Sequence, residues 1–243
     1  MKGLIALLGS GEYLPVMRDV DRHLLANCGA EGRTPRVVCL PTAAGQEGET
    51  SWQRWNHMGC EHFSALNAEV IALPIIDRRS ADDEQYLETI LNADLIYFSG
   101  GDPSYLYKTM RGSKTWAAAQ KAWERGAIYA GCSAGAMILG SHMPDLPTAG
   151  LRRVSAFGVM PASMVLPHFD RLPVWAPTML SMLRSRMREN EFFIGIDEDT
   201  ALVGKAGGDW CVHGRLKVHI ISKQETQSYT AGEKITIPVG KLI

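Results

Sequence analysis

The sequence predicts an α/β protein, built as a three-layer sandwich around a mostly parallel β-sheet. Two observations carry this prediction. Short apolar runs alternate with segments of helical periodicity along the first half of the chain, as in buried parallel strands joined by helices. In addition, residues 127–139, AIYAGCSAGAMIL, combine an apolar strand-like run, a glycine-rich turn and a helical segment, which is the setting of a nucleophile elbow.

Five apolar runs are expected to form the parallel strands. Each ends in a loop rich in glycine, proline or small polar residues, and such loops border ligand crevices at the carboxyl ends of parallel strands. Right-handed crossovers then place helices on both faces of the sheet. The strands are expected at residues 3–8, 36–40, 69–73, 94–98 and 127–130, and the helices at residues 15–27, 51–66, 82–92, 104–110 and 114–125.

The pattern changes after the elbow. A proline-rich loop is expected at residues 140–151, a short strand within 154–165, a loop at 166–171, a helix at 175–189, a strand at 192–196 and an acidic turn at 197–200. Alternating polar and apolar residues then predict antiparallel strands near 201–203, 210–213, 217–221 and 234–237. We therefore expect one α/β domain over residues 1–243, with residues 201–243 as a β appendage.

The composition narrows the classes of function. With 46% hydrophobic residues, 21% charged residues and a net charge of -1, we expect a globular chain without a nucleic acid or membrane partner. We find no apolar run long enough for a membrane span and no signal peptide. The five scattered cysteines form no C-x-x-C pair, so we expect no disulfide framework and no metal site, and a cytoplasmic location. We also expect no cofactor.

The elbow itself predicts a nucleophile. Ser133 is central in Gly131-Cys132-Ser133-Ala134-Gly135. The glycines two positions before and two positions after it let the backbone turn tightly enough to present the hydroxyl. An ordinary glycine-rich turn is the alternative, but the strand before the motif and the helix after it favour the catalytic interpretation. Cys132 occupies a flanking position and is expected to be a small buried residue.

A serine nucleophile needs a base, and the base needs an acidic partner that orients it. His168 is the best candidate for the base, because it follows Ser133 in a loop between Pro167 and Phe169 that can hold the ring. Spacing alone does not choose among the acidic candidates, which are Asp145, Asp170 and Glu198.

Four motifs together resemble one family of serine peptidases, the family of dipeptidase E (aspartyl dipeptidase) and cyanophycinase. The motifs are Gly100-Gly101-Asp102, Gly131-Cys132-Ser133-Ala134-Gly135-Ala136, Pro167-His168-Phe169 and Gly195-Ile196-Asp197-Glu198-Asp199-Thr200-Ala201. The resemblance spans about residues 3–203 and implies a class I glutamine amidotransferase-like fold. An active glutamine amidotransferase would need cysteine at the centre of the elbow, where this chain has serine.

The resemblance also implies roles. Ser133 would be the nucleophile and His168 the base, and the amides of Gly101 and Ala134 would form the oxyanion hole. The acid of the family lies between the serine and the histidine in the chain, which favours Asp145. Small aspartyl peptides would be the substrates, either Asp-X dipeptides or the β-aspartyl peptides of a cyanophycinase-like exopeptidase.

A substrate carboxylate calls for a cationic partner, and Arg171, just beyond His168, is our candidate. Asp102 and Glu198 border the same expected crevice and are further candidates for substrate contact. A small peptide is the expected partner, and a homodimer is left open. The alternative function is that of a non-catalytic binding or regulatory protein on the same fold.

Overall fold

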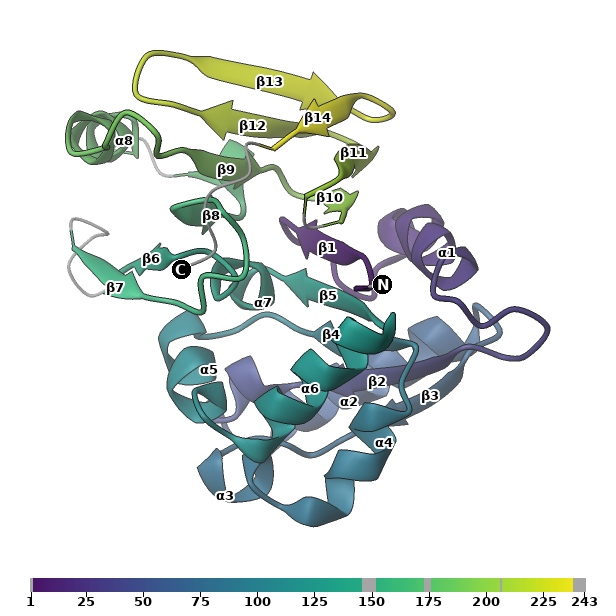
Figure 1. Ribbon diagram of the computed structural model, residues 1–243. Helices are drawn as coiled ribbons and strands as arrows, with labels where there is room; N and C mark the ends of the chain where they lie inside the picture. Colours follow the sequence, from purple (N-terminus) through teal and green to yellow (C-terminus); the bar gives the residue numbers. More distant parts are fainter. Residues whose placement is uncertain (1, 146–151, 173–175, 206, 238–243) are drawn as a thin grey trace.

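A computed structural model describes residues 2–145, 152–172, 176–205 and 207–237. Its main sheet has the strand order β14-β11-β10-β1-β5-β4-β2-β3 (Figure 1). The five strands from β1 to β3 in that order are parallel, and the three on the other side of β1 are antiparallel. The strands are β1 (Ile5–Leu8), β2 (Arg36–Leu40), β3 (Glu69–Ala72), β4 (Leu95–Phe98), β5 (Ile128–Cys132), β10 (Thr200–Gly204), β11 (Asp209–Gly214) and β14 (Lys234–Thr236).

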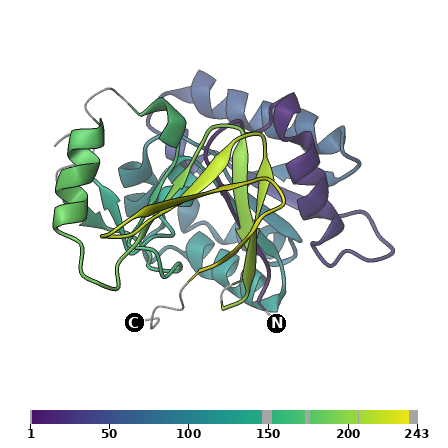
Figure 2. The same ribbon diagram turned by 90° about the horizontal axis from the view of Figure 1, so that it is seen from above.

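A second sheet of four strands, in the order β13-β12-β9-β8, lies beside the antiparallel part of the main sheet (Figures 1 and 2). Within it β8 and β9 run parallel. A hairpin of β6 and β7 completes the strands. These elements are β6 (His142–Pro144), β7 (Arg153–Ser155), β8 (Met164–Leu166), β9 (Phe193–Ile196), β12 (Lys217–Ile221) and β13 (Thr226–Thr230).

The helices cover both faces of the main sheet, with α6 in front of it and α2 behind it in Figure 1. Each face of the main sheet has its own hydrophobic core, because the side chains of neighbouring residues in a strand point to opposite faces. In β1, Ile5 and Leu7 join the core under α5, α6 and α7, whereas Ala6 and Leu8 join the core under α1 and α2. The helices are α1 (Arg18–Ala26), α2 (Glu49–Ser64), α3 (Arg78–Ala81), α4 (Leu87–Leu91), α5 (Pro103–Met110), α6 (Lys114–Arg125), α7 (Ala134–Met137) and α8 (Ala176–Ser185).

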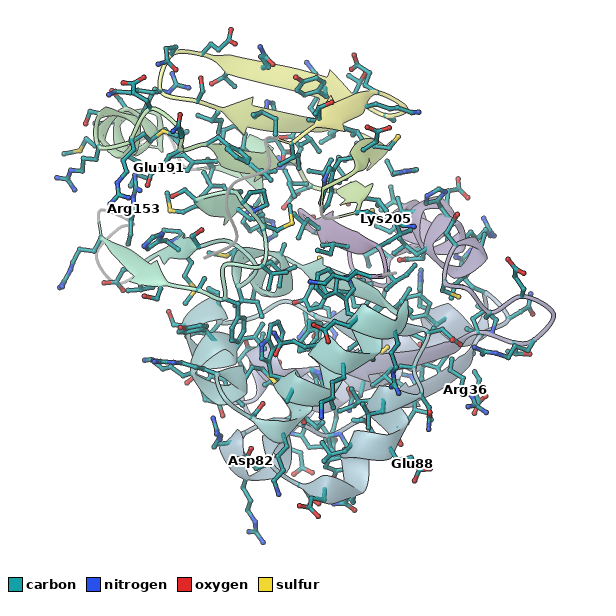
Figure 3. All side chains as sticks on the ribbon, viewed as in Figure 1. Arg36, Asp82, Glu88, Arg153, Glu191 and Lys205 are labelled. Atoms are coloured by element: carbon teal, nitrogen blue, oxygen red, sulfur yellow. The ribbon has the colours of Figure 1, made fainter. Side chains whose placement is uncertain are left out.

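Helix α8 belongs to a third, smaller core on the second sheet. Leu183 of α8 packs with Met164, Phe193 and Ile221 of β8, β9 and β12. An ion pair between Arg153 of β7 and Glu191, just before β9, links the hairpin to this sheet, with Nη1 and Oε2 3.2 Å apart (Figure 3).

The structure confirms the α/β architecture and the large, mostly parallel sheet, and it corrects several elements. The predicted helix at 82–92 is a 3-10 turn, Glu84–Tyr86, followed by α4, and both α3 and β13 were missed. The segment 154–165 contributes to two strands, β7 and β8, instead of one. The strands after residue 200 are divided between the two sheets, because β10, β11 and β14 extend the main sheet while β12 and β13 join the second. Parts of the predicted 140–151 loop and the predicted start of a helix at Trp175 lie outside the described residues.

The topology gathers the candidate residues at one edge. The loops after β1, β2, β4 and β5 leave the carboxyl ends of parallel neighbours and therefore meet at that edge. In the second sheet, β8 and β9 are also parallel, so the loops that follow them, with His168 and Glu198, are adjacent. Among the described helices, none is long and apolar enough to cross a membrane.

Candidate active site

Ser133 lies at the apex of a strained turn between β5 and α7. Its backbone has φ 49° and ψ -105°, a conformation that few residues other than glycine adopt. The two glycines around it are required by close packing. A Cβ on Gly131 would lie 2.4 Å from the carbonyl oxygen of Gly135, and one on Gly135 would lie 2.6 Å from that of Phe98. This is the geometry that the sequence predicts for a nucleophile elbow.

His168 connects the serine to a carboxylate. Its Nε2 lies 3.1 Å from Oγ of Ser133, and its Nδ1 lies 2.9 Å from Oε1 of Glu198. Both distances are hydrogen-bonding distances. With Nδ1 protonated and bonded to the carboxylate, Nε2 is left as the acceptor for the serine hydroxyl. The chain thus holds a serine, a histidine and a glutamate in the order that nucleophilic catalysis needs.

Backbone strain concentrates at this site. Among the described non-glycine residues, five have positive φ, and two of them are Ser133 and His168 themselves. Asp199 directly follows Glu198, and Tyr13 lies in the loop after β1. Asn67 is the fifth. Such conformations cost energy and persist where the surrounding structure enforces them, which is common at functional sites.

The structure places Glu198, and not the expected Asp145, beside Nδ1 of His168. Asp145 follows β6, where its backbone N–H donates to the carbonyl oxygen of Arg152, whereas Nδ1 of His168 is bonded to Glu198. The third candidate, Asp170, is bonded to Glu198 and not to His168. Its Oδ1 accepts the backbone N–H of Glu198 at 2.8 Å. The physical reason is the parallel pairing of β8 with β9, which the sequence did not reveal.

The backbone amides of Gly101 and Ala134 are the predicted oxyanion donors. Among the described residues, neither amide donates a hydrogen bond to another residue. Gly101 has φ 139°, and a Cβ there would lie 2.5 Å from the backbone of Ala43. The loop after β2 therefore packs directly against the loop after β4 and fixes the position of its amides.

The other predicted contact residues have partners within the chain. Asp102 caps α5, since Oδ1 accepts the N–H of Tyr105 at 2.9 Å and Oδ2 accepts from the side chain of Gln46 at 2.9 Å. Arg171 has a side chain that is 69% exposed, and its Nε lies 3.4 Å from Oε2 of Glu198. Arg171 is therefore beside the His168–Glu198 pair, with most of its side chain in solvent.

Cys132 is buried beneath the elbow, as predicted. Burial and the neighbouring Glu12 raise the pKa of its thiol well above the ordinary value, so it is a protonated side chain at neutral pH. Its Sγ donates to Oε2 of Glu12 at 3.0 Å. Glu12 was not singled out from the sequence, although its position right after the glycines that end the first strand was a usable signal.

No group of three or more His, Cys, Asp or Glu side chains within the described ranges has an arrangement suited to a metal ion.

The fold and this geometry define an α/β protein in which a strained elbow serine meets a histidine–carboxylate pair. The chain belongs to peptidase family S51, whose model matches residues 5–208. Membership in this family supports a peptidase activity, that of a hydrolase, for this chain.

Individual proteins that the chain is similar to are also named as peptidases or as cyanophycinase. The chain is 26% identical over 238 residues to a cyanophycinase from Synechococcus elongatus, and this alignment covers 94% of the chain and 70% of the relative. It is 28% identical over 174 residues to the uncharacterized peptidase YgaJ of Bacillus subtilis (strain 168), covering 70% of each. Among solved structures, a peptidase from an acI-B1 Actinobacterium superposes with a TM-score of 0.86 at 37% identity and 98% coverage of both chains.

Proposed function

We propose that this chain is a serine peptidase that cleaves small aspartyl peptides, Asp-X dipeptides or β-aspartyl peptides, through an acyl-enzyme on Ser133. The observation that carries the proposal is the pair of hydrogen bonds at His168, to Ser133 on one side and to Glu198 on the other. Support for the substrate class comes from the family, which includes the cyanophycinase relatives.

In the proposed first step, Oγ of Ser133 attacks the substrate carbonyl carbon while Nε2 of His168 takes the hydroxyl proton. Glu198 stabilises the imidazolium that forms and keeps Nδ1 protonated. The carbonyl oxygen becomes an oxyanion, and the N–H groups of Gly101 and Ala134 would donate to it.

In the next step the tetrahedral intermediate collapses and the carbon–nitrogen bond breaks. The leaving amine takes the proton from His168, and the acyl group stays on Ser133. Water then attacks the ester carbonyl with His168 again as the base, which releases the acid and restores the serine hydroxyl.

The test is a fluorophosphonate probe, because it labels only serines that are activated as nucleophiles. We expect stoichiometric labelling of the wild-type chain at Ser133, found by peptide mass spectrometry, and none in Ser133→Ala. Ser133→Ala should also abolish hydrolysis of an Asp-X and β-aspartyl dipeptide panel with a nearly unchanged melting temperature, since the hydroxyl contributes little packing. An unlabelled wild type would instead favour the non-catalytic binding protein.

A further inference from the structure

Glu12 is a buried acidic residue that the proposed chemistry does not use. It lies in the loop after β1 and is only 8% exposed. Its Oε1 accepts the backbone N–H of Gly100 at 2.9 Å, and its Oε2 accepts from Sγ of Cys132 at 3.0 Å. In the part of the chain that the structure describes, no basic side chain forms an ion pair with this carboxyl group.

Each of the two partners of Glu12 directly precedes a residue of the candidate site. Gly100 precedes Gly101, and Cys132 precedes Ser133. One carboxyl group therefore connects the loop that carries a candidate oxyanion amide with the elbow that carries the candidate nucleophile. The fit is close, because a Cβ on Gly100 would lie 2.6 Å from Oε1 of Glu12.

The loop that carries Glu12 also contacts the turn around Glu198. The N–H of Gly9 donates to the carbonyl oxygen of Thr200 at 2.9 Å, and a Cβ on Gly9 would lie 2.1 Å from the carbonyl oxygen of Asp197. Gly11, at φ 83°, packs against the side chain of Asp199, because a Cβ there would lie 2.8 Å from its Oδ1. The loop after β1 thus contacts the elbow, the loop after β4 and the acidic turn.

Burying an acidic side chain without a cationic partner costs folding free energy, so the burial of Glu12 needs a compensating interaction. Its hydrogen bonds to Gly100 and Cys132 supply that interaction. Without Glu12, the N–H of Gly100 would be a buried donor with no acceptor, and the loop could relieve this only by moving. A displacement of Gly101 by a fraction of an ångström would misplace its amide relative to the reacting carbonyl.

We propose that Glu12 is a positioning residue that fixes the Gly100–Gly101 loop against the nucleophile elbow. Glu12 acts through these two backbone segments and does not touch the substrate. For its effect on turnover, this inference rests on the proposed peptidase function, whereas its effect on the loop does not.

The experiment compares Glu12→Met with Glu12→Gln. Methionine fills a similar volume without an acceptor and without a buried charge, so the variant should fold. Glutamine keeps a carbonyl oxygen for the N–H of Gly100. Asp21→Asn is the control for the loss of another buried carboxylate, since Asp21 is fully buried against His62 on α2. Hydrogen exchange over residues 99–102, followed by mass spectrometry, reports on the loop, and kcat and KM report on catalysis.

We expect faster exchange over residues 99–102 in Glu12→Met and exchange like wild type in Glu12→Gln and Asp21→Asn. In an active enzyme, Glu12→Met should lower kcat by about 100-fold with little change in KM, the signature of a misplaced transition-state donor. Glu12→Gln should restore most of the rate.

Wild-type exchange over residues 99–102 in folded Glu12→Met would overturn the proposal, whatever the activity. So would rapid exchange of the Gly100 amide in the wild-type protein, a measurement that needs no variant. If the wild-type chain neither reacts with the fluorophosphonate nor hydrolyses peptides, the proposed function fails, and the exchange comparison still decides the role of Glu12.

Discussion

Nδ1 of His168 lies 2.9 Å from Oε1 of Glu198, a carboxylate 30 residues further along the chain. The two residues follow β8 and β9, whose parallel pairing brings their carboxyl ends together. The second sheet therefore supplies the histidine and the carboxylate, while the main sheet supplies the serine. Contact between the two sheets is what completes the candidate site.

Glu198→Gln should lower kcat by about ten thousand-fold, because a glutamine can leave the imidazole in the tautomer that donates toward Ser133. Asp145→Asn should change kcat little. The measurement is a side-by-side assay of both variants and Asp170→Asn on the same aspartyl dipeptide. Asp170→Asn should have a smaller effect than Glu198→Gln, because asparagine keeps a side-chain oxygen that can accept the N–H of Glu198. A larger loss at Asp145 than at Glu198 would contradict this assignment.

The sequence predicted the elements that depend on local chemistry. The glycines around Ser133 require a tight turn, and the apolar runs before the loops at Gly9, Pro41 and Gly100 form strands of the main sheet at nearly their predicted ends. Such features follow from neighbouring residues. The glutamine amidotransferase-like class and the single-domain organisation remain predictions.

The features that the sequence did not predict depend on strand pairing. Spacing in the sequence does not choose among Asp145, Asp170 and Glu198, because the choice depends on which loops become adjacent when β9 pairs with β8. Glu12 contacts Gly100 across 88 positions of sequence and Cys132 across 120. No periodicity or motif encodes contacts of that range, so they became visible only in the structure.

Cys132 should resist alkylation in the folded protein. It is fully buried, and burial together with Glu12 raises the pKa of its thiol, so neither access nor thiolate is available. Treatment with iodoacetamide near neutral pH, followed by peptide mass spectrometry, should modify the partly exposed Cys60 and Cys211 first. Modification of Cys132 before these two would show that the elbow opens readily. Cys132→Ala should keep most activity, unlike Ser133→Ala.

Stability should depend on Asp94 at acidic pH. Burial alone would raise the pKa of its carboxyl group, but hydrogen bonds from Arg33 and the backbone N–H of Arg36 outweigh burial and lower it. A lowered pKa in the folded state means that the stabilisation is present above the unfolded pKa, about 4, and is lost as the pH falls through the folded pKa.

Asp94→Asn should therefore lower the free energy of unfolding by about 1–2 kcal/mol at pH 7. The difference from the wild type should shrink as the pH falls below about 4. Urea denaturation at several pH values measures both effects. Asp19→Asn is the matched control, because Asp19 pairs with Arg22 on the surface with 93% of its side chain exposed, and such pairs contribute little. A gap between Asp94→Asn and wild type that stays constant with pH would contradict the linkage.

Arg171 should contribute to selection of acidic substrates. Its Nε lies near Oε2 of Glu198 while its side chain is 69% exposed, so its terminal nitrogens can meet a substrate carboxylate. Two effects must be separated. Loss of a substrate contact lowers kcat/KM for acidic dipeptides alone, whereas loss of support for Glu198 lowers it for every substrate. The ratio of Asp-X to Ala-X hydrolysis therefore isolates the contact.

In a dipeptide panel, Arg171→Met should reduce the Asp-X to Ala-X ratio by about fivefold, or about 1 kcal/mol, because solvent weakens an exposed charge pair. Arg171→Lys should keep part of the preference, since it keeps the charge but loses the planar fork. Arg215→Met is the control, because Arg215 also pairs with a carboxylate, that of Asp199, and also has a largely exposed side chain, at 58%. An unaltered ratio in Arg171→Met would remove Arg171 from the substrate site, and an equal fall for both dipeptides would assign it to Glu198 instead.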